Sequence, residues 1–277
     1  MEITVLVDNN TLIDRYFTAE PGLSLLIEDK ETRVLFDTGY SDLFLKNAEK
    51  MGKDLSNLDF LVISHSHLDH TWGLEPFVRY LTELGIENRP FKRPALVGHP
   101  DIFTSAGMDT IPEFGTLMSK GKMARHLELQ LSKTPVHIGP RLTFLGEIPR
   151  ENSFEGHISF GKKQGSQEPD LVMDDSALVY RSPKGLVIIT GCSHAGICNI
   201  IAYAQKVCSD NRIADVIGGF HLLNPSKKQL TGTLDFFNNI HPDEVHACHC
   251  TDLESKIALS GVANVREVGV GLSLVYE

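Results

Sequence analysis

The stretch Ile63-Ser64-His65-Ser66-His67-Leu68-Asp69-His70-Thr71-Trp72-Gly73 gathers metal-binding side chains within a short length of chain. Three histidines and one aspartate occupy six consecutive positions, directly after the apolar run Phe60–Ile63. That run predicts a buried strand, and the apolar spacing from Gly73 to Leu84 predicts a helix. The cluster is therefore expected on a tight turn between strand and helix. Imidazole nitrogens and a carboxylate together suit zinc, iron or manganese.

The pattern His65-x-His67-x-Asp69-His70 after an apolar strand resembles the signature of the metallo-β-lactamase superfamily. The resemblance covers most of the chain and implies a four-layer αββα sandwich. It also implies that the first two histidines bind one metal ion and that the Asp-His pair binds a second. We therefore expect two divalent ions, with zinc as first choice and iron or manganese as alternatives. A solvated, histidine-rich loop is the plainer interpretation, but apolar residues flank the cluster.

Composition limits the classes of function. A chain of 277 residues without a visible linker predicts a single domain over residues 1–277. The formal net charge of −10 argues against a nucleic-acid or membrane-surface binder, since both need a positive face. A small anionic substrate stays compatible with this charge, because a pair of metal ions dominates its local field. The odd count of five cysteines favours a reduced, cytoplasmic protein over a disulfide framework.

Strand and helix patterns alternate along both halves of the chain. Strands are predicted at residues 3–7, 23–27, 33–36, 58–63, 95–100, 142–145, 176–180, 186–190, 215–221, 244–247 and 265–275. Helices are predicted at residues 43–51, 74–84, 197–207, 227–240 and 253–259. A polar turn at Glu28–Glu31 would join the second and third strands. The pattern weakens over about 86–170, where we expect an irregular insertion, with residues 101–170 as an insertion or lid.

Three later histidines, His194, His221 and His249, also follow apolar strands. Ligands in α/β folds gather at the carboxyl ends of strands, which supports His194 and His249 as metal ligands. His221 is open to three interpretations: a ligand, an acid that faces the substrate, or a structural residue. We expect it to protonate a leaving group, while Asp69 both binds metal and orients a hydroxide held between the two ions.

The chain departs from the commonest superfamily pattern, in which a strand ending in Gly-Asp supplies a carboxylate that bridges the metals. Here the strand at 186–190 ends in Gly191-Cys192-Ser193-His194, so that cysteine stands where aspartate is expected. Asp174 and Asp175, just ahead of another strand, are alternative sources of the carboxylate. The identity of the bridging group therefore stays open among the three residues.

Two further cysteines, Cys248 and Cys250, flank His249 and are additional candidates for metal ligands. Side chains alternate in direction along a strand. This alternation predicts that both cysteines point away from the side on which His249 lies.

Part of the expected lid is basic, although the protein as a whole is acidic. Its positive residues are Lys120, Lys122 and Arg125. A solvated surface is the plain interpretation of such a group. The alternative is an anion clamp that holds a phosphate or carboxylate of the substrate.

Four motifs narrow the resemblance: Ser-His-Ser-His-Leu-Asp-His, Gly-Cys-Ser-His-Ala-Gly-Ile, Gly-Gly-Phe-His-Leu and His-Cys-Thr. They are similar to a bacterial and archaeal branch that includes dihydropteroate synthases of the methanopterin type. Because motifs around a metal do not fix a substrate, the first expectation is a hydrolase that attacks a small phosphate-containing anion through a metal-bound hydroxide. The second is a transferase that joins a dihydropterin diphosphate to an aminobenzene-ribose phosphate. The third is a metal-binding or redox protein without hydrolysis.

Overall fold

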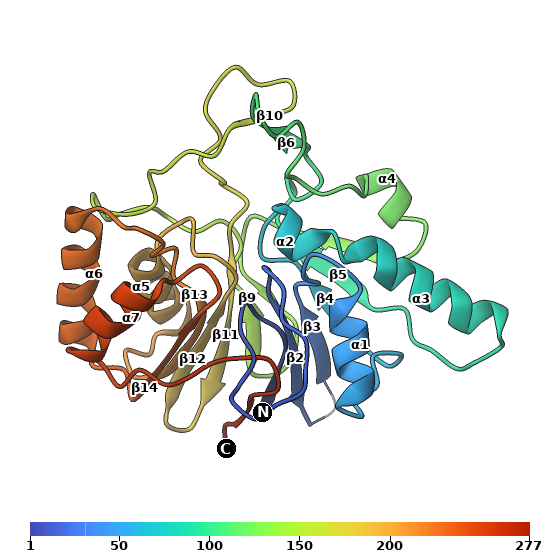
Figure 1. The fold of residues 1–277 in the computed structure, drawn as a ribbon, viewed down its shortest axis with the longest axis horizontal. Helices are drawn as coiled ribbons and strands as arrows, with labels where there is room; N and C mark the ends of the chain where they lie inside the picture. Colours follow the sequence, from blue (N-terminus) through green and yellow to red (C-terminus); the bar gives the residue numbers. More distant parts are fainter. Residues whose placement is uncertain (31) are drawn as a thin grey trace.

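The computed structural model describes residues 1–30 and 32–277 and folds them into two packed β-sheets with helices outside (Figure 1). The first sheet has the order β15 (Ser273–Val275), β1 (Glu2–Val7), β2 (Ser24–Asp29), β3 (Thr32–Phe36), β4 (Phe60–Val62), β5 (Ala95–Gly98) and β7 (Glu128–Leu131). The second has the order β14 (Glu244–Cys248), β13 (Ile213–Gly219), β12 (Gly185–Thr190), β11 (Ala177–Ser182), β9 (Leu142–Phe144) and β8 (Val136–His137).

Helices cover the outer face of each sheet. The first sheet carries α1 (Leu43–Lys50) and α3 (Leu74–Ile86), and the second carries α5 (Ile197–Cys208), α6 (Lys227–Ile240) and α7 (Leu253–Ser260). Shorter elements are α2 (Leu68–Thr71), α4 (Lys120–Met123), β6 (Ala106–Gly107) and β10 (Lys162–Lys163). The layers follow the predicted αββα order.

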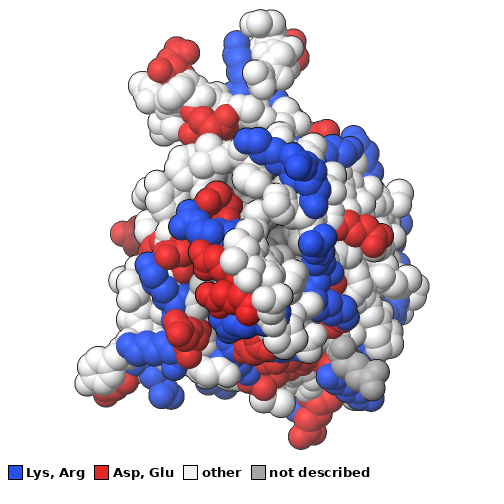
Figure 2. All heavy atoms as spheres, turned by 90° about the vertical axis from the view of Figure 1, so that its right-hand side faces the viewer, with Lys and Arg blue, Asp and Glu red and all other residues white. Residues whose placement is uncertain are grey.

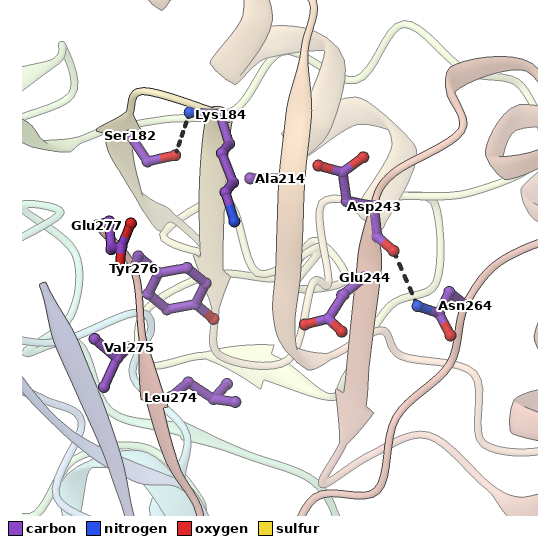
Figure 3. Close-up of a pocket in the computed structure, with 10 residues that line it drawn as sticks. All are labelled: Ser182, Lys184, Ala214, Asp243, Glu244, Asn264, Leu274, Val275, Tyr276 and Glu277. Carbon is purple, nitrogen blue, oxygen red and sulfur yellow. Dashed lines mark hydrogen bonds between the residues drawn. The ribbon is translucent and has the colours of Figure 1, made fainter.

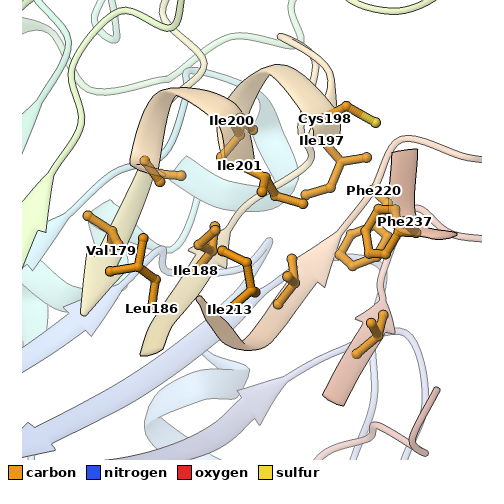
Figure 4. Packing of buried hydrophobic residues seen from close by; sticks show 14 of the residues in the cluster. Val179, Leu186, Ile188, Ile197, Cys198, Ile200, Ile201, Ile213, Phe220 and Phe237 are labelled. Carbon is orange, nitrogen blue, oxygen red and sulfur yellow. The ribbon is translucent and has the colours of Figure 1, made fainter. Parts of the chain in front are cut away.

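Apolar side chains fill all three interfaces between the layers. Phe36 and Val62 of the first sheet meet Tyr180 and Ile217 of the second in the central interface. On the outer side of the second sheet, one apolar face of α5 packs against the strands, beside the stacked rings of Phe220 and Phe237 (Figure 4). Burial at about 25 cal/mol per Å² of apolar surface is the main force that holds such layers together.

Strand direction decides where loop side chains meet. In the first sheet β3, β4 and β5 are parallel, and in the second sheet β12, β13 and β14 are parallel. The carboxyl ends of parallel strands lie at one edge of a sheet. The loops after β4, β12, β13 and β14 consequently come together at one end of the sandwich.

Several predicted elements need correction. The strand expected at 265–275 is reduced to Ser273–Val275, because Gly271 adopts a left-handed φ of 95° against the ring of Phe17. The stretch 86–170 is less irregular than expected: besides the predicted strands β5 and β9, it contains β7 and β8, which extend the two main sheets. The predicted turn at Glu28–Glu31 includes Glu31, which lies outside the described residues.

The protein is acidic overall, but one face carries charges of both signs (Figure 2). On the face shown in Figure 2, Lys and Arg side chains are interspersed with Asp and Glu. None of the helices within the described residues is both long and apolar enough to cross a bilayer.

Candidate metal centre

The loop after β4 turns sharply and presents its polar side chains to one side. His65 and His67 lie on the extended segment, and the short helix α2 begins immediately after His67. The hydroxyl of Thr71 donates to the carbonyl oxygens of Ser66 (3.1 Å) and His67 (2.9 Å), which closes the turn. Asp69 and His70 lie on α2, so that the motif presents ligands from two directions.

Three histidines form a group of candidate metal ligands, called the first ligand group: His65, His67 and His194. Their ring nitrogens lie within 4.8 Å of one another. The Nε2 atoms of His65 and His67 and both ring nitrogens of His194 are buried without a hydrogen-bond partner. Burying a polar atom without a partner costs free energy, and such atoms are rare in proteins. Three of them converging on one point fit a bound cation.

The second ligand group consists of Asp69, His70 and His249. Nε2 of His249 lies 3.3 Å from Oδ2 of Asp69 and 3.2 Å from Nε2 of His70. Two imidazole nitrogens and a carboxylate oxygen at such spacing also match a site for a divalent transition-metal ion. The chain thus brings together all six ligands predicted from its sequence, in two adjacent groups.

Hydrogen bonds fix the orientation of three of these rings. The pairs are His65 Nδ1 with Ser64 Oγ (2.9 Å), His70 Nδ1 with Asp37 Oδ2 (2.7 Å) and His249 Nδ1 with Asn9 Oδ1 (2.9 Å). Because Asp37 and the Asn9 carbonyl only accept, and Ser64 donates to Asp37, each Nδ1 must carry the proton. In the neutral form of each ring, Nε2 then keeps a lone pair for a metal ion, as ligand histidines with outer-sphere partners do.

Burial and contacts set the protonation of the two groups differently. Burial lowers the pKa of His65 and His194 well below the ordinary range and lowers the pKa of His67 to about 4. These rings are neutral at pH 7, which is the form that binds metal. Burial opposes charge in the second group too, but the neighbouring His70 and His249 lower the pKa of Asp69. Asp69 in turn raises the pKa of His249 to about 9.

The two cysteines near His249 behave differently from each other. Cys248 lies in the core between the sheets, as strand alternation predicts. The prediction for Cys250 is wrong: its Sγ belongs to a converging group with Cys192 and His249. The strand ends at Cys248, and His249 has a left-handed φ of 52°, so alternation no longer applies at Cys250.

Asp174 and Asp175 hold loops in place. Asp174 accepts from the backbone N–H of Ser66 and from Nζ of Lys163, both at 2.8 Å. Asp175 accepts from the backbone N–H of Ala195 at 2.8 Å, and burial raises its pKa to about 7. Neither residue belongs to a group of converging ligands among the described residues.

His221 faces the same cavity from the end of β13. Its ring centre lies 4.3 Å from that of His194, and its buried Nδ1 has no hydrogen-bond partner. It belongs to neither ligand group. The position is compatible with the predicted role of a residue that exchanges a proton with a bound substrate, and this role stays a prediction.

A cavity of about 310 Å³ opens onto both ligand groups. Its lining includes Asn9, Phe160, Leu223 and Thr251, together with ligands of both groups. The ring of Phe160 lies 4.8 Å from that of His194 and 5.3 Å from that of His221, centre to centre. The long loop before β11 therefore does cover part of the site.

The predicted anion clamp does not lie at this cavity. Lys120, Lys122 and Arg125 are exposed on and after α4, and none of them lines the cavity. The short helix packs Met123 inward against the core of α1 and α3, which turns the basic side chains toward solvent. The sequence correctly indicated that these basic side chains are at the surface. It could not indicate whether they point toward the cavity or away from it.

Sequence reasoning overlooked Asn9 and Phe160. Asn9 orients His249 from the loop after β1, and the neighbouring Asp8 accepts the backbone N–H of His249 at 2.9 Å. The pair Asp8-Asn9 at the end of an apolar strand was an available signal. Phe160 offered none, since it lies in a loop rich in glycine and lysine.

A second cavity, of about 560 Å³, lies at the opposite end of the sheets (Figure 3). Tyr276 and Glu244 line it, and Asp215, Glu244 and His246 form a third group of converging atoms beside it. The carboxylate of Asp215 is already occupied by His246 (2.8 Å) and the Tyr276 hydroxyl (2.6 Å). The Asp215 carboxylate is thus satisfied within the structure, in contrast to the unpartnered histidine nitrogens at the other end.

The sequence profile of the Metallo-beta-lactamase superfamily matches residues 17–203. The chain belongs to this superfamily. The match includes the loop after β4 and the loop after β12, which supply the whole first ligand group. Members of the superfamily generally bind metal ions, in keeping with the two ligand groups.

Relatives extend the likeness over nearly the whole chain. An uncharacterised protein of Methanocaldococcus jannaschii, MJ0448, is 30% identical over 264 residues, which are 95% of each chain. The 7,8-dihydropterin-6-methyl-4-(beta-D-ribofuranosyl)-aminobenzene-5'-phosphate synthase of the same organism is 29% identical over 275 residues, covering 92% of this chain and 89% of the synthase. The crystal structure of Tm1679, described as a metal-dependent hydrolase of the beta-lactamase superfamily, is 29% identical, with a TM-score of 0.81 over 100% of both chains.

Proposed function

We propose that the protein is a hydrolase that holds two divalent metal ions and acts on a small, phosphate-containing anion. The observation that carries the proposal is the convergence of buried, unpartnered ring nitrogens from His65, His67 and His194, next to the second ligand group. Similarity to a solved metal-dependent hydrolase over the full length supports the same reaction class.

Bound in the two groups, divalent ions would supply Lewis-acid activation of water and of a substrate oxygen. Around them, Asp69 is partly exposed to the cavity and accepts hydrogen bonds, so that it can orient a water molecule for attack. His221 faces the cavity with an unpartnered Nδ1 and can transfer a proton to a leaving group. Phe160 shields one side of the histidines from solvent.

The cavity itself limits the substrate. None of its described lining residues is Lys or Arg, so the negative charge of a substrate must be balanced by the metal ions and by histidines. Two divalent ions carry more positive charge than Asp69 and the rim residue Asp252 remove. A volume of about 310 Å³ is at the small end for ligand sites. Both features favour a small anion.

A second candidate is a transferase that uses the same site with an amine as acceptor in place of water. The similarity to a dihydropterin-aminobenzene phosphate synthase over 92% of the chain favours it. Phe160 and Leu223 give the cavity apolar surfaces against which a flat ring system could pack.

One assay separates the two candidates. Metal-loaded protein is incubated with nitrophenyl phosphate esters, and separately with a dihydropterin diphosphate with and without an aminobenzene acceptor. A hydrolase releases nitrophenol or phosphate without any acceptor, whereas a transferase forms the coupled pterin only when the amine is present. His67→Ala should abolish either activity, and the control His137→Ala, on β8 outside both ligand groups, should keep it. Full metal content without turnover of any substrate would contradict both candidates.

A further inference from the structure

We infer that Cys192 is a ligand shared by the two metal positions, with its thiolate sulfur in place of a bridging carboxylate. The inference rests on the proposed pair of metal ions and adds the identity of the group between them. It follows from the position of one sulfur atom relative to both ligand groups.

The Sγ atom of Cys192 lies where the two groups meet. It is 3.2 Å from Nε2 of His70 and 3.1 Å from Nε2 of His249, both in the second group. It also converges within 4.8 Å with a ring nitrogen of His65, which belongs to the first group. The rings of His70 and His249 are oriented through Nδ1 by Asp37 and Asn9, so that each Nε2 faces this sulfur. One sulfur is therefore within reach of ions in either group.

Without a metal ion, hydrogen bonds can occupy these atoms. A thiol carries one proton, which Cys192 can donate to Nε2 of His70, and Nε2 of His249 lies 3.3 Å from Oδ2 of Asp69. The sulfur and the two nitrogens nevertheless lie within 3.2 Å of one another. A cation bound in the second ligand group would therefore contact all three atoms together.

Carboxylates that could bridge in its place are absent from the described centre, apart from Asp69. Asp174 and Asp175 accept hydrogen bonds from the loop backbones and belong to neither ligand group. The end of β13 offers no acid either, because its last residue is Gly219. A Cβ at Gly219 would lie 2.6 Å from Sγ of Cys250, closer than such contacts allow.

Cys250 is a supporting residue rather than the shared ligand. Its thiol donates to the carbonyl oxygen of Cys192 at 3.3 Å, which uses its proton and holds the Cys192 backbone in place. The backbone N–H of His221 points at the same sulfur at 3.3 Å. Cys192 has no such backbone contact through its sulfur among the hydrogen bonds of the described residues.

A shared thiolate has consequences for the choice of metal. A thiolate carries one negative charge, as a carboxylate does. The net charge of the centre is therefore the same as it would be with a bridging carboxylate. Sulfur is a softer ligand than oxygen and favours zinc or ferrous iron over manganese or magnesium. The inference therefore narrows the expected metals to zinc and iron.

Cobalt substitution tests the inference without any substrate. Cobalt(II) bound to a thiolate gives a near-ultraviolet charge-transfer band, while visible d–d bands report bound cobalt regardless of sulfur. The variants are Cys192→Asp, Cys192→Ser and Cys250→Ser, with Cys248→Ser as control because Cys248 lies in the core between the sheets. We expect the charge-transfer band in the wild type, the control and Cys250→Ser. Both Cys192 variants should lose it, and Cys192→Asp should keep its d–d bands and two ions.

X-ray absorption of the zinc-loaded wild type requires no variant. We expect sulfur at about 2.3 Å from the metal, and Cys192→Asp should lack this scatterer. Two bound ions without sulfur, or a charge-transfer band that persists in Cys192→Asp, would overturn the inference and leave the metal pair intact. A wild type that binds no cobalt and no zinc would overturn both the proposed function and the inference.

Discussion

Oδ2 of Asp37 lies 2.7 Å from Nδ1 of His70, and Oδ1 of the same carboxylate accepts the backbone N–H of Ser64 at 2.7 Å. A residue at the end of β3 thereby sets both the ring orientation of a ligand and the path of the loop after β4. The hydroxyl and backbone N–H of Thr38 add contacts to the His70 carbonyl oxygen. The turn Asp37-Thr38-Gly39 thus holds His70 of the second ligand group in position and is called the brace.

Replacing Asp37 by Asn should weaken metal binding at the second ligand group. In the wild type both carboxylate oxygens of Asp37 accept hydrogen bonds, from Ser64 and from His70 Nδ1. The amide of Asn has only one acceptor oxygen, so the N–H at His70 Nδ1 loses its partner. Loss of such an outer-sphere contact typically costs 10- to 100-fold in metal affinity. Competitive titration with a chelator measures the change.

The matched control is Asp59→Asn, in which the residue accepts the backbone N–H of Arg33 at 2.7 Å and precedes β4, whereas the ligand loop follows that strand. It should leave both ions bound with wild-type affinity. Equal affinities in Asp37→Asn and the wild type would show that the brace has no part in metal binding.

Phe160 provides a prediction about substrate binding. Its ring packs against the rings of His194 and His221. A phenyl ring cannot bind a metal ion, so Phe160 contributes apolar surface to the cavity and no ligand. Phe160→Ala should raise KM more than it lowers kcat and should keep the full metal content. Ile158→Ala is the control, because Ile158 lies on the same loop and is 50% exposed. If kcat fell while KM stayed constant, Phe160 would act on the chemical step and not on binding.

The pattern around residue 63 was sufficient to predict the first motif, because strand, turn and ligands are local there. The later loops were harder. Ser193, His221 and His249 are non-glycine residues with left-handed φ values of 63°, 52° and 52°, which strand periodicity cannot anticipate. This is why Cys250 was placed on the wrong side of its strand.

Long-range pairing explains the remaining differences. Asn9 and His249 are 240 positions apart, and only the register of the folded sandwich brings them within 2.9 Å. The orientation of α4 is set by Met123, which packs into the core beside α1 and α3. The charges of the basic residues on α4 therefore could not show whether these residues face solvent or the site. The sequence therefore predicted the local ligand motif, but it did not predict the contact that Asn9 makes across the sandwich.

Glu155 gives a prediction about pH. It is buried at the start of α5 and accepts the backbone N–H groups of Cys198 (3.2 Å) and Asn199 (2.7 Å). Burial raises the pKa of this carboxyl. In the range between the unfolded and folded pKa values the folded state binds more protons, so this group contributes less stability as the pH rises through its folded pKa.

Glu155→Gln removes this titration. The variant loses some stability at every pH, because its NH₂ group faces backbone donors. Its deficit relative to the wild type should be largest at about pH 4 and should shrink toward pH 7. Urea unfolding of both proteins over this range measures the difference, in which the contributions of other carboxylates cancel. A deficit that grows with pH would mean that the ionised carboxylate is the stabilising form.

Gly219, at the end of β13, leaves room for His249, which follows the neighbouring strand β14. A Cβ there would lie 2.6 Å from the carbonyl oxygen of Gly191 and 3.1 Å from Cδ2 of His249. Gly219→Ala must therefore push His249 or the loop after β12 aside, at a cost of about 1–3 kcal/mol for overpacking. Since His249 is held between Asn9 and the second ligand group, the displacement should also reduce bound metal toward one ion per chain. Gly121→Ala is the control, as nothing lies within 4 Å of its Cβ and it stands in α4. Calorimetry and metal analysis are carried out on both variants. Unchanged stability and two bound ions in Gly219→Ala would show that the ligand loops accommodate the methyl group without loss of stability or metal.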